Sequence, residues 1–202
     1  MPGAASSGTV EIVAVGVSTG GPAALAQVVP ALPSDIGVPI VIVQHMPPLF
    51  TQSLAESLDA RSALRVREAQ HLDRLEKGVV YIAPGGRHMR VGHAADGGMV
   101  VLVTDDPPEN NCRPAVDYLF RSVAEHYPGR SAAVVLTGMG SDGTLGLRLL
   151  KRRGSTTIAQ EEASCVVFGM PRAAIEAGVV DFVLPLDAIA AKVAAVARGR
   201  RL

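Results

Sequence analysis

Short apolar runs alternate with amphipathic stretches along most of the chain. The apolar runs are rich in Val and Ile, and several lack polar residues, which is typical of parallel strands buried on both faces. We predict strands at residues 10–15, 40–43, 79–82, 132–136, 156–159 and 179–184. The intervening stretches predict helices at residues 21–31, 51–59, 114–126, 145–153, 171–177 and 186–196. This alternation is typical of an α/β domain with a parallel sheet.

One segment departs from the alternation. Residues 87–91 and 99–103 flank a polar stretch that contains glycine, and this pattern predicts a β-hairpin. The chain shows neither repeats nor an internal linker, so we predict a flexible leader at residues 1–9 and one domain at residues 10–202. The expected fold class is α/β: a three-layer, doubly wound, mostly parallel sheet with an inserted antiparallel β-hairpin. Functional groups in such sheets gather beyond the carboxyl ends of the strands.

The composition narrows the class of protein. The 202 residues are 48% hydrophobic and carry 19 basic and 19 acidic side chains, which suits a globular domain. A nucleic-acid-binding domain would show an excess of basic residues, so we expect no nucleic-acid partner. No apolar run approaches the roughly 18 residues that cross a bilayer, so we expect no membrane insertion. Two cysteines and the lack of a signal-peptide pattern predict a cytoplasmic protein.

The turn after the first predicted strand contains a G-x-S-x-G pattern at residues 16–20. A serine in this strand–turn–helix setting is a candidate nucleophile that needs an adjacent base, so we single out Ser18. The backbone amides of Thr19 and Gly20, at the start of a predicted helix, are candidate donors to a developing oxyanion. The alternative is a phosphate-binding glycine turn in which Ser18 caps the helix.

His45 directly follows the second predicted strand. Consecutive strands of βαβ units are usually neighbours, so we expect His45 and Ser18 at the same rim of the sheet. His45 is therefore a candidate general base, although a histidine at a strand end can also be purely structural.

A glycine-rich loop follows the predicted strand at residues 132–136 and contains Asp142. This carboxylate is a candidate partner for the ring nitrogen of His45 that faces away from the serine, where it would fix the tautomer. The alternative is that Asp142 caps the helix after the loop. The amides of Met139 and Gly140 are further candidate oxyanion donors.

Other residues compete for these roles. Asp105, Asp106 and Glu109 are rivals for the third position, but they follow a hairpin strand and rank lower. Cys165 is a possible thiol nucleophile or, as we expect, a small buried thiol. Residues 110–114 either shape a substrate cleft or cap the next helix.

Two enzyme families that share parts of this pattern are disfavoured. The order Ser, His, Asp differs from that of α/β-hydrolases, in which the histidine comes last. The first loop does not fit the G-x-G-x-x-G pattern of nicotinamide-binding folds.

Four ordered segments resemble the catalytic domain of the chemotaxis protein-glutamate methylesterase family: VGVSTGGP at 15–22, VQHM at 43–46, LTGMGSDG at 136–143 and AQEEASCVVFGMP at 159–171. The resemblance covers about residues 10–198. It implies a serine hydrolase that releases methanol from glutamate methyl esters on the cytoplasmic helices of chemoreceptors, and members often also deamidate receptor glutamines. By match to these segments, Ser18 is the nucleophile, His45 the general base and Asp142 the residue that orients it. The resemblance implies no metal and no organic cofactor.

The two-domain members of that family carry a phosphoaccepting receiver before the esterase, whereas about nine residues precede the first predicted strand here. Three interpretations stay open: a free-standing esterase controlled by a separate regulatory protein, a relative that acts in another chemosensory pathway, and a piece of a longer two-domain protein. Two other functions stay open at this point. One is a phosphate-binding enzyme like nucleotide or lipid kinases that uses residues 140–144, Gly-Ser-Asp-Gly-Thr. The other is a non-catalytic chemosensory binding module.

Overall fold

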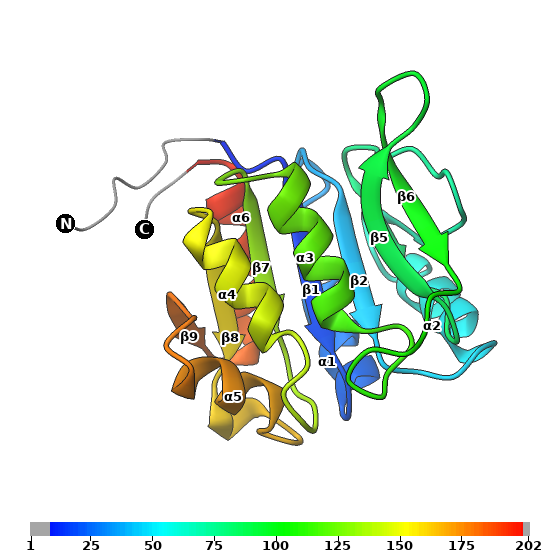
Figure 1. Cartoon of the computed structure of the whole chain (residues 1–202). Helices are drawn as coiled ribbons and strands as arrows, with labels where there is room; N and C mark the ends of the chain where they lie inside the picture. The colour runs from blue at the N-terminus through cyan, green and yellow to red at the C-terminus, as the bar shows by residue number, and fades with distance from the viewer. Residues whose placement is uncertain (1–8, 200–202) are drawn as a thin grey trace.

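A computed structural model describes residues 9–199 of the chain. The predicted leader, apart from its last residue, lies outside the described residues. Within that range a seven-stranded parallel sheet lies between two layers of helices, next to a separate two-stranded antiparallel sheet (Figure 1). The predicted fold class is therefore confirmed, with the hairpin forming a sheet of its own. In the same range, none of the helices has the length and apolar character that a membrane span needs.

The central strand of the large sheet is β1, which pairs with β2 on one side and with β7 on the other. The order across the sheet is β3-β4-β2-β1-β7-β8-β9, and all the pairings are parallel. The strands are β1 (Ile12–Val17), β2 (Ile40–Gln44), β3 (Arg65–Glu68), β4 (Val79–Ile82), β7 (Ser131–Val135), β8 (Thr156–Gln160) and β9 (Phe182–Leu184). The connections from β1 and β7 lead to opposite edges of the sheet, so a crevice is expected between the carboxyl ends of these neighbouring strands.

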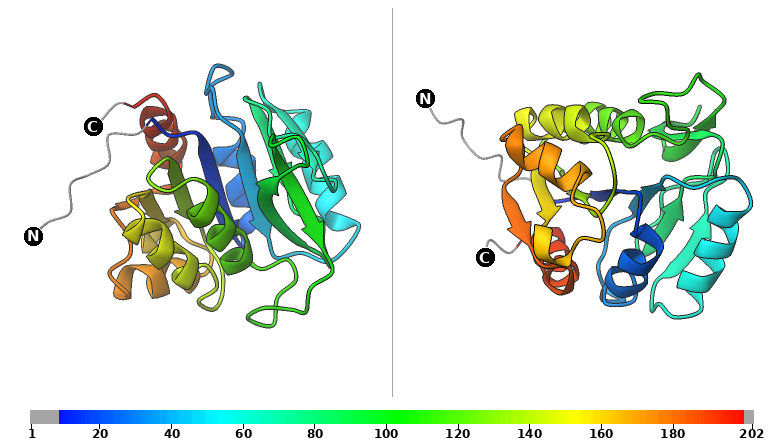
Figure 2. Two further views of the ribbon diagram at one scale, coloured as in Figure 1. Left: turned by 45° about the horizontal axis from the view of Figure 1, so that its top comes forward. Right: turned by 90° about the horizontal axis from the view of Figure 1, so that it is seen from below.

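Helices cover both faces of the sheet (Figure 2). One face carries α1 (Gly21–Val28), α2 (Phe50–Asp59) and α6 (Leu186–Ala197). The other carries α3 (Val116–His126), α4 (Thr144–Arg152) and α5 (Met170–Glu176), and the hairpin of β5 (His88–His93) and β6 (Met99–Thr104) packs beside α3. A short 3₁₀ helix, η1 (Glu162–Ser164), follows β8.

Residues of β1 contribute to both halves of the core. Val13 and Val15 pack with α1 and α6, whereas Ile12 and Ala14 pack on the side of α3. Gly16 allows α3 to approach the sheet closely, because a Cβ atom at this position would lie 2.3 Å from Cγ1 of Val116. This close approach brings the N-terminus of α3 to the carboxyl end of β1.

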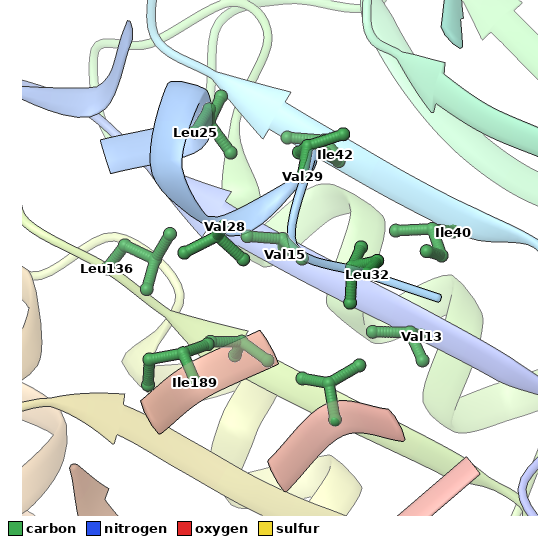
Figure 3. Close-up of a pocket in the computed structure, with 12 residues that line it drawn as sticks. Val13, Val15, Leu25, Val28, Val29, Leu32, Ile40, Ile42, Leu136 and Ile189 are labelled. Carbon is green, nitrogen blue, oxygen red and sulfur yellow. The ribbon is translucent and has the colours of Figure 1, made fainter. Parts of the chain in front are cut away.

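A small cavity lies between α1, α6 and the sheet (Figure 3). Its volume is about 10 Å³, and only aliphatic side chains such as Leu25, Leu136 and Ile189 line it. A space this small without polar groups is a gap in the packing. The cavity therefore offers no polar group for binding or catalysis.

Candidate active site

Ser18 and His45 follow two paired strands at the same edge of the sheet. Val17 of β1 is in register with Gln44 of β2, and the backbone N–H of His45 donates to the carbonyl of Val17 at 3.1 Å. The N–H of Ser18 donates to the carbonyl of Thr137, just beyond β7, at 3.0 Å. The loops after β1, β2 and β7 are thus joined to one another by backbone hydrogen bonds, as the sequence predicts for Ser18 and His45.

A hydrogen bond links His45 to Asp142. Nε2 of His45 lies 2.8 Å from Oδ2 of Asp142, and the two side chains are 14% and 4% exposed. An ionised carboxylate only accepts hydrogen bonds, so Nε2 carries the proton and Nδ1 keeps its lone pair. Nδ1 faces Sγ of Cys112 at 3.8 Å. The hydroxyl of Ser18 makes no hydrogen bond to any residue in the range 9–199.

The carboxylate of Asp142 sits at the N-terminus of α3. It accepts hydrogen bonds from the backbone N–H groups of Val116 at 2.6 Å and Asp117 at 2.9 Å, and from Nδ2 of Asn110 at 2.8 Å. The first amides of a helix have no partner inside the helix and favour a negative charge. The alternative that Asp142 caps the helix after it is wrong, because α4 starts after Gly143 without a side-chain cap.

These contacts determine the charge of Asp142. Burial alone would raise the pKa of this carboxyl group. The hydrogen bonds from His45, from the amides of Asp117 and Val116, and from Asn110 outweigh burial and hold the pKa below its ordinary value. Asp142 is therefore a carboxylate at neutral pH and can stabilise a positive charge on His45.

Asp117 of α3 makes the reciprocal contact, with a backbone amide of α4. Its carboxylate, in the first turn of α3, accepts a hydrogen bond from the backbone N–H of Gly146 in α4 at 2.7 Å. Nδ2 of Asn110 donates to Asp117 at 2.9 Å as well as to Asp142, so one amide group bridges both carboxylates. Burial, followed by the charge of Asp142, raises the pKa of Asp117, although the bonds from Gly146 and Asn110 lower it. No pattern in the sequence singled out Asp117, and Asn110 was expected only within a segment that shapes a cleft or caps the next helix.

Gln44 is a second residue of the site that was not predicted from the sequence. Its side chain is 2% exposed, and its Nε2 donates to the backbone carbonyls of Ser18 and His45, each at 3.0 Å. One buried amide therefore fixes both loops relative to each other. The signal in the sequence was a polar residue at the end of an otherwise apolar strand, next to the candidate base.

The four candidate oxyanion donors lie on two loops, the one that carries Ser18 and the one after β7, whose Thr137 is hydrogen-bonded to Ser18. In the described part of the chain, the N–H groups of Thr19, Gly20, Met139 and Gly140 donate to no protein acceptor. They remain available for a substrate, and their role stays a prediction.

The rival acidic residues are engaged elsewhere. Asp105 forms a salt bridge with Arg87, Asp106 accepts a hydrogen bond from Tyr118, and Glu109 pairs with Arg121. Cys165 is half-buried, and burial together with Glu162 and Glu161 raises the pKa of its thiol to about 11. A thiol with so high a pKa is protonated at neutral pH, which argues against its use as a nucleophile.

The sheet topology and this cluster define a class of protein: a doubly wound α/β domain with a serine, a histidine and an aspartate at the carboxyl edge of its sheet. Comparisons with known proteins identify the family. The family model described as CheB methylesterase matches residues 13–193. The chain belongs to the CheB methylesterase family.

Individual relatives agree with this assignment. The chain is 51% identical over 187 residues to a protein of Desulfotalea psychrophila, and 53% identical over 183 residues to a protein of Geobacillus kaustophilus. Both are named protein-glutamate methylesterase/protein-glutamine glutaminase. The matches cover 92% and 90% of this chain but 51% and 52% of the relatives, so the chain spans about half the length of these proteins.

The fold also matches a solved structure. The crystal structure of the Thermotoga maritima CheB methylesterase catalytic domain superposes with a TM-score of 0.89 at 46% sequence identity. The match covers 92% of this chain and 98% of the crystallised chain. The similarity therefore extends over nearly the whole of that catalytic domain.

Proposed function

We propose that residues 10–202 form a protein-glutamate methylesterase domain in which Ser18, His45 and Asp142 are the catalytic residues. One observation carries the assignment: the 2.8 Å hydrogen bond between His45 Nε2 and Asp142 Oδ2, beside Ser18 at the carboxyl edge of the sheet. The names of the relatives support the type of reaction.

In the first half of the reaction, Oγ of Ser18 attacks the carbonyl carbon of a glutamate methyl ester. Nδ1 of His45 accepts the serine proton, because Nε2 is occupied by Asp142. The serine hydroxyl replaces the contact between Nδ1 and Cys112 as the substrate binds, in keeping with catalytic hydrogen bonds that tighten only in the complex. The resulting imidazolium lies against the carboxylate of Asp142, which stabilises the charge.

The tetrahedral intermediate carries a negative charge on the former carbonyl oxygen. The amides of Thr19 and Gly20 follow Ser18 directly, those of Met139 and Gly140 lie on the loop after β7, and all four lack protein acceptors among residues 9–199. Fixed N–H donors at the position of a developing charge lower the barrier without reorganisation. We assign the oxyanion site to amides from this group.

The second half regenerates the enzyme. His45 gives its proton to the departing methanol, and the acyl-enzyme that remains is hydrolysed by water with His45 again acting as base. A glutamine side chain would follow the same route with ammonia as the leaving group. This shared intermediate accounts for a possible glutaminase activity. The reaction as written needs no cofactor.

The proposed substrate is a methylated helix of a chemoreceptor. Large apolar side chains are exposed on the loops after β2, β7 and β8 and on the first residue of α2, beyond the carboxyl ends of the strands: Leu49, Phe50, Met139 and Val166. Exposed apolar side chains around a polar site suit contact with the apolar positions of an amphipathic helix. Such receptor helices lie in the cytoplasm, so we also propose a cytoplasmic location. A separate regulatory protein stays a prediction.

A kinase-like function is less compatible with the site. That function would need Asp142 to face a phosphate or a metal ion. Both oxygens of Asp142 are instead engaged by the amides of α3, by Asn110 and by His45. The carboxylate of Asp142 thus faces the protein and not a bound phosphate or metal ion.

Ser18→Ala tests the proposal. We expect loss of methanol release from a methylated chemoreceptor and an unchanged thermal unfolding temperature, because the hydroxyl makes no hydrogen bond to residues 9–199. Ser57→Ala, on the exposed side of α2, is the matched control and should remain active. Unchanged turnover by Ser18→Ala would exclude the serine mechanism. A nitrophenyl ester assayed in parallel separates a general esterase from one that requires the receptor.

A further inference from the structure

Cys112 contacts the catalytic cluster although the proposed reaction does not use it. Its Sγ lies 3.8 Å from Nδ1 of His45, on the side of the imidazole opposite Asp142. The sequence separates these two residues by 67 positions, so no ligand spacing signals the contact. Across residues 9–199, the group formed by His45, Cys112 and Asp142 places three potential ligand atoms within 4.8 Å of one another.

The two facing atoms are ligands that zinc prefers. Bond lengths of about 2.0–2.1 Å to imidazole nitrogen and 2.3 Å to sulfur, at a tetrahedral angle, place the two ligand atoms about 3.6 Å apart. The observed separation of 3.8 Å between Nδ1 and Sγ is close to this value. A cation between them therefore requires little movement of either side chain.

The surroundings of the imidazole also suit a metal ligand. The hydrogen bond from Nε2 to Asp142 fixes the tautomer with the lone pair on Nδ1, directed at Cys112. Histidine ligands of metals commonly donate their other N–H to a carboxylate, which orients the ring and increases its basicity. The side chain of His45 is 14% exposed and Cys112 is also partly exposed, so solvent, and with it a hydrated cation, reaches both residues.

We propose that Cys112 and His45 form a binding site for a thiophilic divalent cation such as Zn²⁺, with Asp142 as the outer partner of the imidazole. The cation bonds to Sγ and Nδ1, and the thiol proton is released to water. The bound cation occupies the lone pair that accepts the serine proton, so it inhibits ester hydrolysis. This inhibition rests on the proposed function, whereas the binding site does not.

Two measurements on the whole chain test the proposal, one of binding and one of activity. Binding is followed with Co²⁺ as the probe, because a cobalt–thiolate bond gives a charge-transfer band in the near ultraviolet. Activity is followed as methanol release at increasing Zn²⁺, with each variant normalised to its own rate in a chelator. Cys112→Ser removes the thiolate ligand, and Cys165→Ser is the matched control for the other cysteine of the chain.

We expect the cobalt band in the wild type and in Cys165→Ser, and its loss in Cys112→Ser. The Zn²⁺ concentration for half-inhibition should rise at least about tenfold in Cys112→Ser, since loss of even an outer partner costs a metal site this much. It should stay unchanged in Cys165→Ser.

Absence of the band in the wild type, or its persistence in Cys112→Ser, would overturn the binding site. Equal Zn²⁺ sensitivity of the wild type and Cys112→Ser would overturn the inhibitory role. A cobalt band in a protein without esterase activity would instead contradict the proposed function and leave the metal site in place. His45→Ala provides a second variant for binding, and it should weaken the band even though it is inactive.

Discussion

Each oxygen of the Asp142 carboxylate accepts two hydrogen bonds, one from the backbone and one from a side chain. Oδ2 accepts from the N–H of Val116 and from Nε2 of His45, and Oδ1 accepts from the N–H of Asp117 and from Nδ2 of Asn110. An asparagine in this place offers one oxygen and one NH₂ group, which only donates. Whichever way the amide is turned in Asp142→Asn, its NH₂ group faces a backbone N–H that cannot reverse its direction.

The cost follows from these contacts. A buried donor left without an acceptor destabilises a protein by about 1–3 kcal/mol. For a domain of this size, each kcal/mol lowers the unfolding temperature by about 2–4 °C, so we expect a decrease of roughly 2–12 °C. Activity should fall by up to about 10⁴-fold when the NH₂ group faces His45, because the imidazole then holds its proton on the wrong nitrogen. In the other orientation the amide oxygen accepts the hydrogen bond from His45, but activity should still fall because the imidazolium no longer lies beside a negative charge.

The assay combines thermal unfolding with methanol release from a methylated receptor. Asp105→Asn is the control, because this exposed carboxylate pairs with Arg87 on the surface and such pairs contribute little. An Asp142→Asn protein that unfolds within about 1 °C of the wild type would refute the helix-capping role. A destabilised variant with wild-type turnover would refute the role of Asp142 in orienting His45.

Three further predictions concern the same region. The difference in unfolding free energy between the wild type and Asp142→Asn should shrink in acid, which unfolding at a series of pH values measures. The pKa of Asp142 is lowered in the folded state, so its carboxylate stabilises the fold above the unfolded-state pKa of about 3.9. This contribution disappears as the pH falls through the folded-state pKa. Gly138→Ala should lower kcat and destabilise the fold by about 1–3 kcal/mol, because the new Cβ would lie 2.6 Å from Cβ of Ser18; wild-type kcat and stability would contradict this. Gln44→Leu should lower kcat by about tenfold to a hundredfold, because the backbone carbonyls of Ser18 and His45 lose the amide that donates to both. Steady-state kinetics measure this, and an unchanged kcat would show that the two loops do not need the side chain of Gln44.

The sequence predicted the buried strands and the helices well, because their apolar periodicity is strong. It missed β3 at the edge of the sheet, since its only fully buried residue is Val66 and its other side chains are charged. The places of Ser18 and His45 followed from the ends of two strands, and the expected hydrogen bond from His45 to Asp142 is present. Their catalytic roles stay a proposal.

Other parts of the site could not be predicted from local patterns. The contacts of Asn110 with Asp142, and of Asp117 with Gly146, span 32 and 29 residues and depend on how two helices pack. The approach of Cys112 to His45 depends on the path of a loop after the hairpin. Neither periodicity nor motif spacing carries such information, because both describe a single element at a time.

A carboxylate near the start of each of the helices α3 and α4 accepts hydrogen bonds from backbone amides of the other helix. Asp142, two residues before α4, holds the first amides of α3, and Asp117, at the start of α3, holds an amide of α4. Neither helix start is complete until the two helices have docked, so the aspartate beside His45 reaches its place only in the assembled domain. In a partly folded chain Asp142 would not orient His45, so we expect Ser18 to be inactive. Substitutions in the contact between α3 and α4 should therefore lower the proposed esterase activity without touching the substrate, so turnover would report on how stably these two helices are docked.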